Sequence, residues 1–241
     1  TYSDAQDVMS LTSSIAFSNY GFATLNGLLN DRELTTSTFS RPHRVVMSGT
    51  VNLPADFEFS LIYSGVSGSP FGYVINGDAN ADGVGGTNRE FNDMVYVPRD
   101  RDDISMFGAS SAAQNAAYDS LAAFIADQSC LRNQRGQIME RNSCRNPWIN
   151  RLDARLQKLV PTFAGQTMIF SLDVFNLLNM IDSDWGLVKQ TSTFEGQTLV
   201  RLRGWDNLNN RGIYSLSLPI VNRVDPLASV WRIQLGGKYM W

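Results

Sequence analysis

The stretch from residue 78 to residue 83 carries side chains that could bind a metal ion. Asp78, Asn80 and Asp82 alternate along the chain and Gly83 follows them. This is the D-x-N-x-D-G spacing that opens a calcium-binding loop. Oxygen donors at alternate positions converge on one cation, and the glycine permits the sharp turn that this requires. The stretch therefore predicts Ca²⁺ as a cofactor.

The rest of this loop departs from the EF-hand pattern. The seventh position, Val84, would offer its backbone carbonyl, but the twelfth position is Arg89, where an EF-hand has a bidentate glutamate. Glu90 or Asp93 would have to supply that carboxylate, which requires the loop to fold back. The predicted ligands are Asp78, Asn80, Asp82 and Asp93. A turn of Asp, Asn and Gly residues without an ion is the alternative.

The two cysteines of the chain, Cys130 and Cys144, lie in one long connection. In an extracellular setting they are expected to form a disulfide, which would remove about 3 kcal/mol of loop entropy from the unfolded chain. A zinc site is not expected, because two thiolates need further ligands and the one histidine, His43, is far away in the sequence.

Catalytic chemistry is not predicted. The sequence has no G-x-S-x-G motif, since Gly65-Val66-Ser67-Gly68 continues to Ser69. The histidine at position 43 precedes an alternating segment and is expected to line the end of a strand. We therefore do not expect an enzyme.

Composition and charge argue against two classes of protein. The net charge is −3 and the isoelectric point is about 5.2, with no dense stripe of Lys and Arg, so a nucleic-acid partner is not expected. The sequence has no run of about 18 apolar residues and hence no candidate transmembrane helix. Transmembrane β-strands stay open as a possibility, because they need only about 9–11 residues, of which half are polar.

Five segments alternate between apolar and polar residues with a period of two, which predicts β-strands. They cover about residues 43–53, 57–65, 148–160, 166–176 and 230–241. Of 27 positions on their apolar faces only Lys158 is charged, whereas the 26 positions on the opposite faces carry eight charges. A Lys or Arg at the midplane of a bilayer costs roughly 2–4 kcal/mol, so this asymmetry is what lipid contact would select.

The connections between these strands are of two kinds. The turns at Pro54 and Pro161 have a few residues, whereas the connections over about 4–42, 66–147 and 177–229 have tens of residues. If successive strands run up and down, all short turns lie at one end and all long loops at the other, as in transmembrane β-barrels.

The long connections should contain some structure of their own. Residues 109–128 have apolar positions at helical spacing, and we expect this helix to pack over the base of its own loop. The apolar positions are Ala113, Ala116, Ala117, Leu121, Phe124 and Ile125. A ribbon of residues 199–203 with residues 213–218 is also expected.

We predict an all-β fold in which these segments are the last six or so antiparallel strands of a large transmembrane barrel. A soluble β-sandwich, whose strands also alternate, is the alternative. Five or six strands cannot close a barrel of this kind, and open edges in lipid leave backbone groups unsatisfied, so other strands should complete it. Residues 1–3 look like the end of a strand, and a chain that begins at Thr1 is expected to be a processed or partial product.

Several segments together carry a resemblance to a known family. They are residues 41–44, 69–71 with 76–83, 92–98, 144–148, 173–179 and the last strand. The combination resembles the C-terminal part of a TonB-dependent receptor of the Oar type, which carries a carboxypeptidase-regulatory-like domain at its N-terminus. The end of the last strand, with Tyr239 and Trp241, resembles the membrane-insertion signal by which outer-membrane barrels are recognised and folded.

The resemblance implies a barrel of about 22 strands in the bacterial outer membrane, with extracellular loops. It implies uptake of an unknown nutrient or peptide-like ligand. The expected partners are the missing barrel strands and plug, the TonB complex, the barrel-assembly machinery and the lipid bilayer. A calcium-stabilised surface protein with an adhesive or structural role in an envelope assembly is the alternative function.

Overall fold

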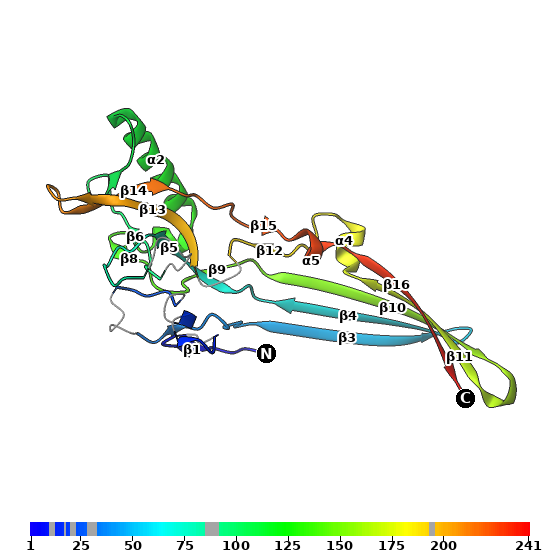
Figure 1. Ribbon diagram of the computed structural model, residues 1–241. Helices are drawn as coiled ribbons and strands as arrows, with labels where there is room; N and C mark the ends of the chain where they lie inside the picture. Colours follow the sequence, from blue (N-terminus) through cyan, green and yellow to red (C-terminus); the bar gives the residue numbers. More distant parts are fainter. Residues whose placement is uncertain (10–12, 17, 20–22, 28–32, 85–91, 193–195) are drawn as a thin grey trace.

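The computed structural model describes the chain except for residues 10–12, 17, 20–22, 28–32, 85–91 and 193–195 (Figure 1). Arg89 and Glu90, which the calcium prediction mentions, lie outside the described residues. Within the described ranges, no helix is both long enough and apolar enough to cross a membrane.

A five-stranded antiparallel sheet forms one half of the molecule, in the order β16-β11-β10-β4-β3 (Figure 1). Its strands are β3 (Arg44–Leu53), β4 (Phe57–Val66), β10 (Ile149–Pro161), β11 (Thr167–Phe175) and β16 (Arg232–Met240). These bounds differ from the expected ranges by no more than two residues. Residues 1–3 were expected to be the end of a further strand. Tyr2 forms an antiparallel bridge to His43 beside β3, and backbone hydrogen bonds join Ser3 to Pro42 and Arg44 to Thr1.

Both short turns lie at the same end of this sheet (Figure 1). Between β3 and β4, Ala55 and Asp56 adopt left-handed backbone conformations with φ of 63° and 58°. This is the local geometry that reverses a tight hairpin with the right twist. Between β10 and β11, a 3-10 turn over Phe163–Gly165 ends at Gly165 with φ of 76°. The predicted separation of short turns from long connections is confirmed.

The long connections fold into a second sheet at the other end, which corrects the expectation that they are mainly loops. Its order is β7-β14-β13-β5-β9. The strands are β5 (Pro70–Asn76), β7 (Ser105–Met106), β9 (Cys144–Arg145), β13 (Gly196–Asp206) and β14 (Arg211–Leu216). The β13–β14 ribbon was expected, whereas β5 and its parallel pairing with β13 were not.

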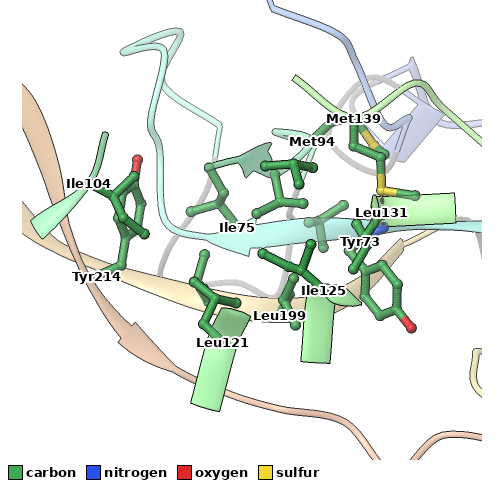
Figure 2. Close-up of a cluster of buried hydrophobic side chains, with 14 of the residues drawn as sticks. Tyr73, Ile75, Met94, Ile104, Leu121, Ile125, Leu131, Met139, Leu199 and Tyr214 are labelled. Atoms are coloured by element: carbon green, nitrogen blue, oxygen red, sulfur yellow. Dashed lines mark hydrogen bonds between the residues drawn. The ribbon is translucent and has the colours of Figure 1, made fainter. Parts of the chain in front are cut away.

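The helix α2 (Ser111–Asp127) covers this second sheet (Figures 1 and 2). The Ser110 side chain accepts a hydrogen bond from the backbone N–H of Ala113, which caps the first turn. Leu121 and Ile125 are buried against β5 and β13, as Figure 2 shows, so the helix does pack on its own loop. Its predicted face was partly wrong: Ala113 is exposed, while Tyr118, which was not predicted, is buried.

The remaining elements are short and lie in the long connections. They are β1 (Gln6–Asp7), β2 (Thr35–Thr36), β6 (Tyr96–Val97), α3 (Ser129–Arg132), β8 (Gln137–Ile138), α4 (Leu177–Ile181), β12 (Lys189–Gln190), β15 (Arg223–Val224) and α5 (Pro226–Ser229). We use the name loop domain for residues 67–147 together with residues 182–222. These two ranges contain the second sheet and α2.

Candidate membrane-spanning surface

The five-stranded sheet has one continuous apolar face. Residues directly opposite each other on paired antiparallel strands share a face. One such row runs across all five strands and consists of Gly49, Leu61, Ala154, Val174 and Ile233. Every member belongs to the set of alternating, mainly apolar positions of its own strand. The register therefore places the five predicted apolar faces on the same side.

In the part of the chain that the structure describes, no second layer packs against this face. The exposed fraction is 79% for the side chain of Leu235, 59% for Met47 and 49% for Phe170. Among the described residues, the buried hydrophobic core draws on the loop domain and on no residue of the five strands. A β-sandwich requires a covering sheet, so that alternative is contradicted. An apolar face of this extent marks contact with lipid or with another protein.

Aromatic rings lie at both ends of the apolar face. At the loop end, the His43 ring stacks on Trp148 with centroids 6.0 Å apart, and Tyr2 lies 5.3 Å from His43. At the turn end, the ring centroids of Tyr239 and Trp241 are 6.3 Å apart. The strands between these two bands have 9 to 13 residues. Aromatic bands that bracket strands of this length match the two interfaces of a bilayer.

Lys158, the one charged position on the apolar face, lies beside a turn. Its Nζ donates a hydrogen bond to the backbone oxygen of Ala55 and lies 4.7 Å from the centre of the Phe57 ring. A lysine so placed can keep its stem in the apolar region and its ammonium at the boundary. The exception to the apolar pattern is thus located where a membrane surface tolerates it.

The opposite face carries the charged groups. Arg155 on β10 and Asp173 on β11 lie directly opposite each other and form an ion pair. Of the ion pairs formed by the described residues, this is the only one within the five strands. Arg151 donates to the backbone oxygen of Ala228 at 2.9 Å, and Asp153 accepts from the N–H of Asn176 at 2.8 Å. These two hydrogen bonds hold the segments next to β16 and β11 against the polar face of the sheet.

The predicted calcium ligands do come together in the loop domain. Asp78 accepts from the N–H groups of Asp82 and Gly83 at 3.1 and 2.9 Å, and Asp93 accepts from the N–H of Ala79 at 2.6 Å. The amides of Asn80 and Asn92 each donate to Asp82, at 3.2 and 3.0 Å.

These contacts suit either a calcium loop or a turn without an ion. Asn92 is fully buried, and its Oδ1 has no hydrogen-bond partner although its amide lies against the Asp82 carboxylate. No group of three or more His, Cys, Asp or Glu with metal-binding geometry occurs within the described ranges. Calcium stays a prediction.

A family model described as "outer membrane beta barrel domain" matches residues 1–193 of the 241-residue chain. The chain belongs to this outer membrane beta barrel domain family. No curated protein and no solved structure matches it. The match agrees with the bare apolar face and its two aromatic bands, and it places the barrel domain in the bacterial outer membrane.

Cys130 and Cys144 form a disulfide in the loop domain of this outer membrane beta barrel protein, as predicted, with Cα atoms 5.2 Å apart. The bond ties α3 to β9 at the edge of the core that Figure 2 shows, where Leu131 is fully buried. The pairing fits the oxidising side of a membrane.

Removing this disulfide should loosen the loop domain. We expect a Cys130→Ser and Cys144→Ser double variant to lose about 3 kcal/mol, because the unfolded loop regains its entropy. Urea titration followed by limited proteolysis between residues 129 and 146 measures the change. The untouched protein in dithiothreitol is the matched control, and equal urea midpoints for the oxidised, reduced and variant forms would contradict the expectation.

The stability of the loop domain should also depend on the protonation of Asp93. Burial, together with the nearby charges of Asp82 and Asp78, raises the pKa of Asp93 to about 6 from 3.8. The folded state therefore binds a proton more tightly than the unfolded state does. The free energy of unfolding should fall as pH rises from about 4 to about 6 and then level off.

An Asp93→Asn variant tests this dependence. Solvent screening reduces the full linkage energy, so we expect a fall of about 1–2 kcal/mol in the parent and a flat profile in the variant. Urea titrations of the complete protein in chelator at several pH values measure it. A parent profile as flat as that of Asp93→Asn would refute the expected shift.

Proposed function

We propose that this chain forms part of the wall and part of the external cap of a TonB-dependent uptake receptor with a barrel of about 22 strands. One observation carries the proposal: the sheet is a single layer with two open edges, and its long connections fold into a domain at one end only. In the described chain, β3 and β16 have no neighbouring strand along their outer edges apart from the bridge of Tyr2 to His43.

Open edges support a larger barrel because lipid offers no hydrogen bonds. Every backbone N–H and C=O in the hydrocarbon must be satisfied within the protein, so β3 and β16 must each pair with a further strand. The polar face with its Arg155–Asp173 pair would then face the lumen, where a plug would contact it. The loop domain would lie outside the cell.

The loop domain has an open pocket that suits capture of a ligand. Its volume is about 290 Å³, close to the lower limit of pockets that bind small molecules. Its walls include the carboxylate of Asp93, the guanidinium of Arg211 and the rings of Tyr96 and Trp205. The Nε of Arg211 makes no hydrogen bond and lies 3.7 Å from a carboxylate oxygen of Asp206, with which it forms an ion pair. A ligand with a carboxylate and an apolar side chain, such as a short peptide, would match the guanidinium and the rings.

Two measurements on the complete protein test the proposal. It should retain a soluble periplasmic fragment of TonB in a pull-down, and cells should accumulate a fluorescently labelled peptide mixture only when TonB is present. A Trp205→Ala and Arg211→Ala double variant should lose accumulation, whereas Leu208→Ala, on a fully exposed side chain of the same ribbon, should not. A complete protein that does not bind TonB would contradict uptake and favour the structural role.

We also propose that the loop of Asp78, Asn80, Asp82 and Asp93 binds calcium, which the buried and unpartnered Oδ1 of Asn92 supports. Millimolar Ca²⁺ should slow proteolysis between residues 76 and 93 in the parent and have no effect in Asp82→Ala. Mg²⁺ is the matched control ion, because it favours smaller octahedral sites that keep several waters. Cleavage rates unchanged by Ca²⁺ in the parent would sink this proposal.

A further inference from the structure

Two arginines from distant parts of the chain meet just beyond the loop end of the five-stranded sheet. Arg41 Nη1 lies 3.1 Å from the backbone oxygen of Ser40, and Arg145 Nη1 lies 3.2 Å from the same oxygen. Arg145 Nη1 also donates to the backbone oxygen of Gly68 at 3.0 Å. Both residues are exposed. The shared carbonyl therefore holds two guanidinium groups side by side at the surface.

The positive charge of this pair is not compensated by a carboxylate. The ion pairs formed in the part of the chain that the structure describes include neither arginine. The hydrogen bonds given above, with one from Arg41 Nη1 to the backbone oxygen of Thr38, use only Nη1 of each guanidinium. Partial burial of each guanidinium lowers the pKa of both arginines, and the charge of Arg41 lowers the pKa of Arg145 further. Two adjacent cations of this kind favour an anion that both can contact.

The position of the pair indicates which anion it meets. Arg41 precedes His43 by two residues and Arg145 precedes Trp148 by three, and the rings of His43 and Trp148 stack in the aromatic band at the loop end of the apolar face. Aromatic bands lie at the level of lipid headgroups. The two guanidinium groups therefore lie at the boundary where the headgroups of surrounding lipid begin.

We propose that Arg41 and Arg145 together bind the phosphate of a lipid headgroup in the leaflet on the loop side of the membrane. The planar guanidinium forms parallel, charge-assisted hydrogen bonds to phosphate oxygens, and two groups on one carbonyl can contact different oxygens of the same phosphate. With the loops outside the cell, as proposed above, this lipid is the phosphorylated lipid A of the outer leaflet. The site does not depend on whether the receptor transports anything.

Retention of lipid by the complete protein, purified in detergent, tests the site. The protein is incubated with lipid A, with dephosphorylated lipid A or with phosphatidylglycerol, then exchanged into fresh detergent, and the bound lipid is quantified by mass spectrometry. We expect an Arg41→Ala and Arg145→Ala double variant to retain about tenfold less lipid A than the parent, because two charge-assisted contacts are lost. Dephosphorylated lipid A should be retained by neither protein.

Arg44→Ala is the matched control, because Arg44 lies at the same end of β3 but on the polar face, and it should retain lipid A as the parent does. If the double variant does not fold, Arg41→Ala alone serves, since its contacts are local backbone oxygens. Equal retention by parent and variants would overturn the proposal. Displacement of lipid A by millimolar inorganic phosphate would show a site for free phosphate instead. Preference for phosphatidylglycerol would overturn the outward orientation. TonB binding is measured separately, so failure of the lipid site and failure of the proposed uptake function can be distinguished.

Discussion

A positive charge at the centre of the apolar face should prevent stable assembly of the protein in a membrane. In Leu61→Arg the guanidinium would replace a member of the row that lies between Gly49 and Ala154, which offer neither a carboxylate nor a polar boundary. The expected loss is roughly 2–4 kcal/mol, the cost of Arg at the bilayer midplane. Lys158 avoids this cost only because it lies beside a turn. Heat-modifiable migration on gels and urea titration in vesicles measure the folded fraction.

The next residue of the same strand provides a matched control. Ile62 is on the polar face, is 49% exposed and lies directly opposite Asp153. Ile62→Arg makes the same kind of substitution one residue away, with a carboxylate opposite the new charge, and should change stability by less than about 1 kcal/mol. If Ile62→Arg were the more damaging variant, the polar face would be the one in contact with lipid and the assignment of faces would be reversed.

The five strands could be predicted from the sequence because their environment is two-sided. A strand with lipid on one side and a polar interior on the other must alternate, and a period of two is visible without knowing its neighbours. Even the exception, Lys158, lies beside a turn. The loop domain could not be predicted in this way, because β5 is buried on both faces and its residues Phe71, Tyr73, Val74 and Ile75 form a run without alternation.

The sites differ in the same respect. The disulfide and the acidic loop were predictable because their members are close in sequence and their spacing has chemical meaning. The arginine pair gave no such signal, since Arg41 and Arg145 are about a hundred positions apart. They meet because Arg145 donates to the backbone oxygens of residue 40, which precedes β3, and residue 68, which follows β4. The pocket wall, likewise, combines Asp93, whose backbone oxygen accepts from Ile75 of β5, with Arg211 of β14. The parallel pairing of β5 with β13, the partner strand of β14, brings them together, and no local pattern indicates it.

Truncating the core of the loop domain should unfold that domain while leaving the membrane sheet intact. Leu121 on α2 is 2% exposed and packs with Ile75 and Leu199 in the buried cluster of Figure 2. We expect Leu121→Ala to cost about 2–5 kcal/mol, the transfer and cavity energy of a buried leucine. Leu208→Ala removes the same atoms from a side chain that is 96% exposed and should cost less than about 0.5 kcal/mol.

Two readouts on the complete protein separate the domains: protease cleavage within residues 111–127 reports the loop domain, and heat-modifiable migration reports the barrel. Leu121→Ala should shift the first to lower urea and leave the second unchanged, because the buried core shares no residue with the five strands in the described chain. The links between them include polar contacts. The N–H of His43, next to β3, donates to the Ser67 hydroxyl at 3.2 Å, and the amide of Asn176, next to β11, donates to the backbone oxygen of Gly186 at 3.0 Å. Equal shifts in both readouts would mean that these few hydrogen bonds make the loop domain and the barrel unfold as one cooperative unit.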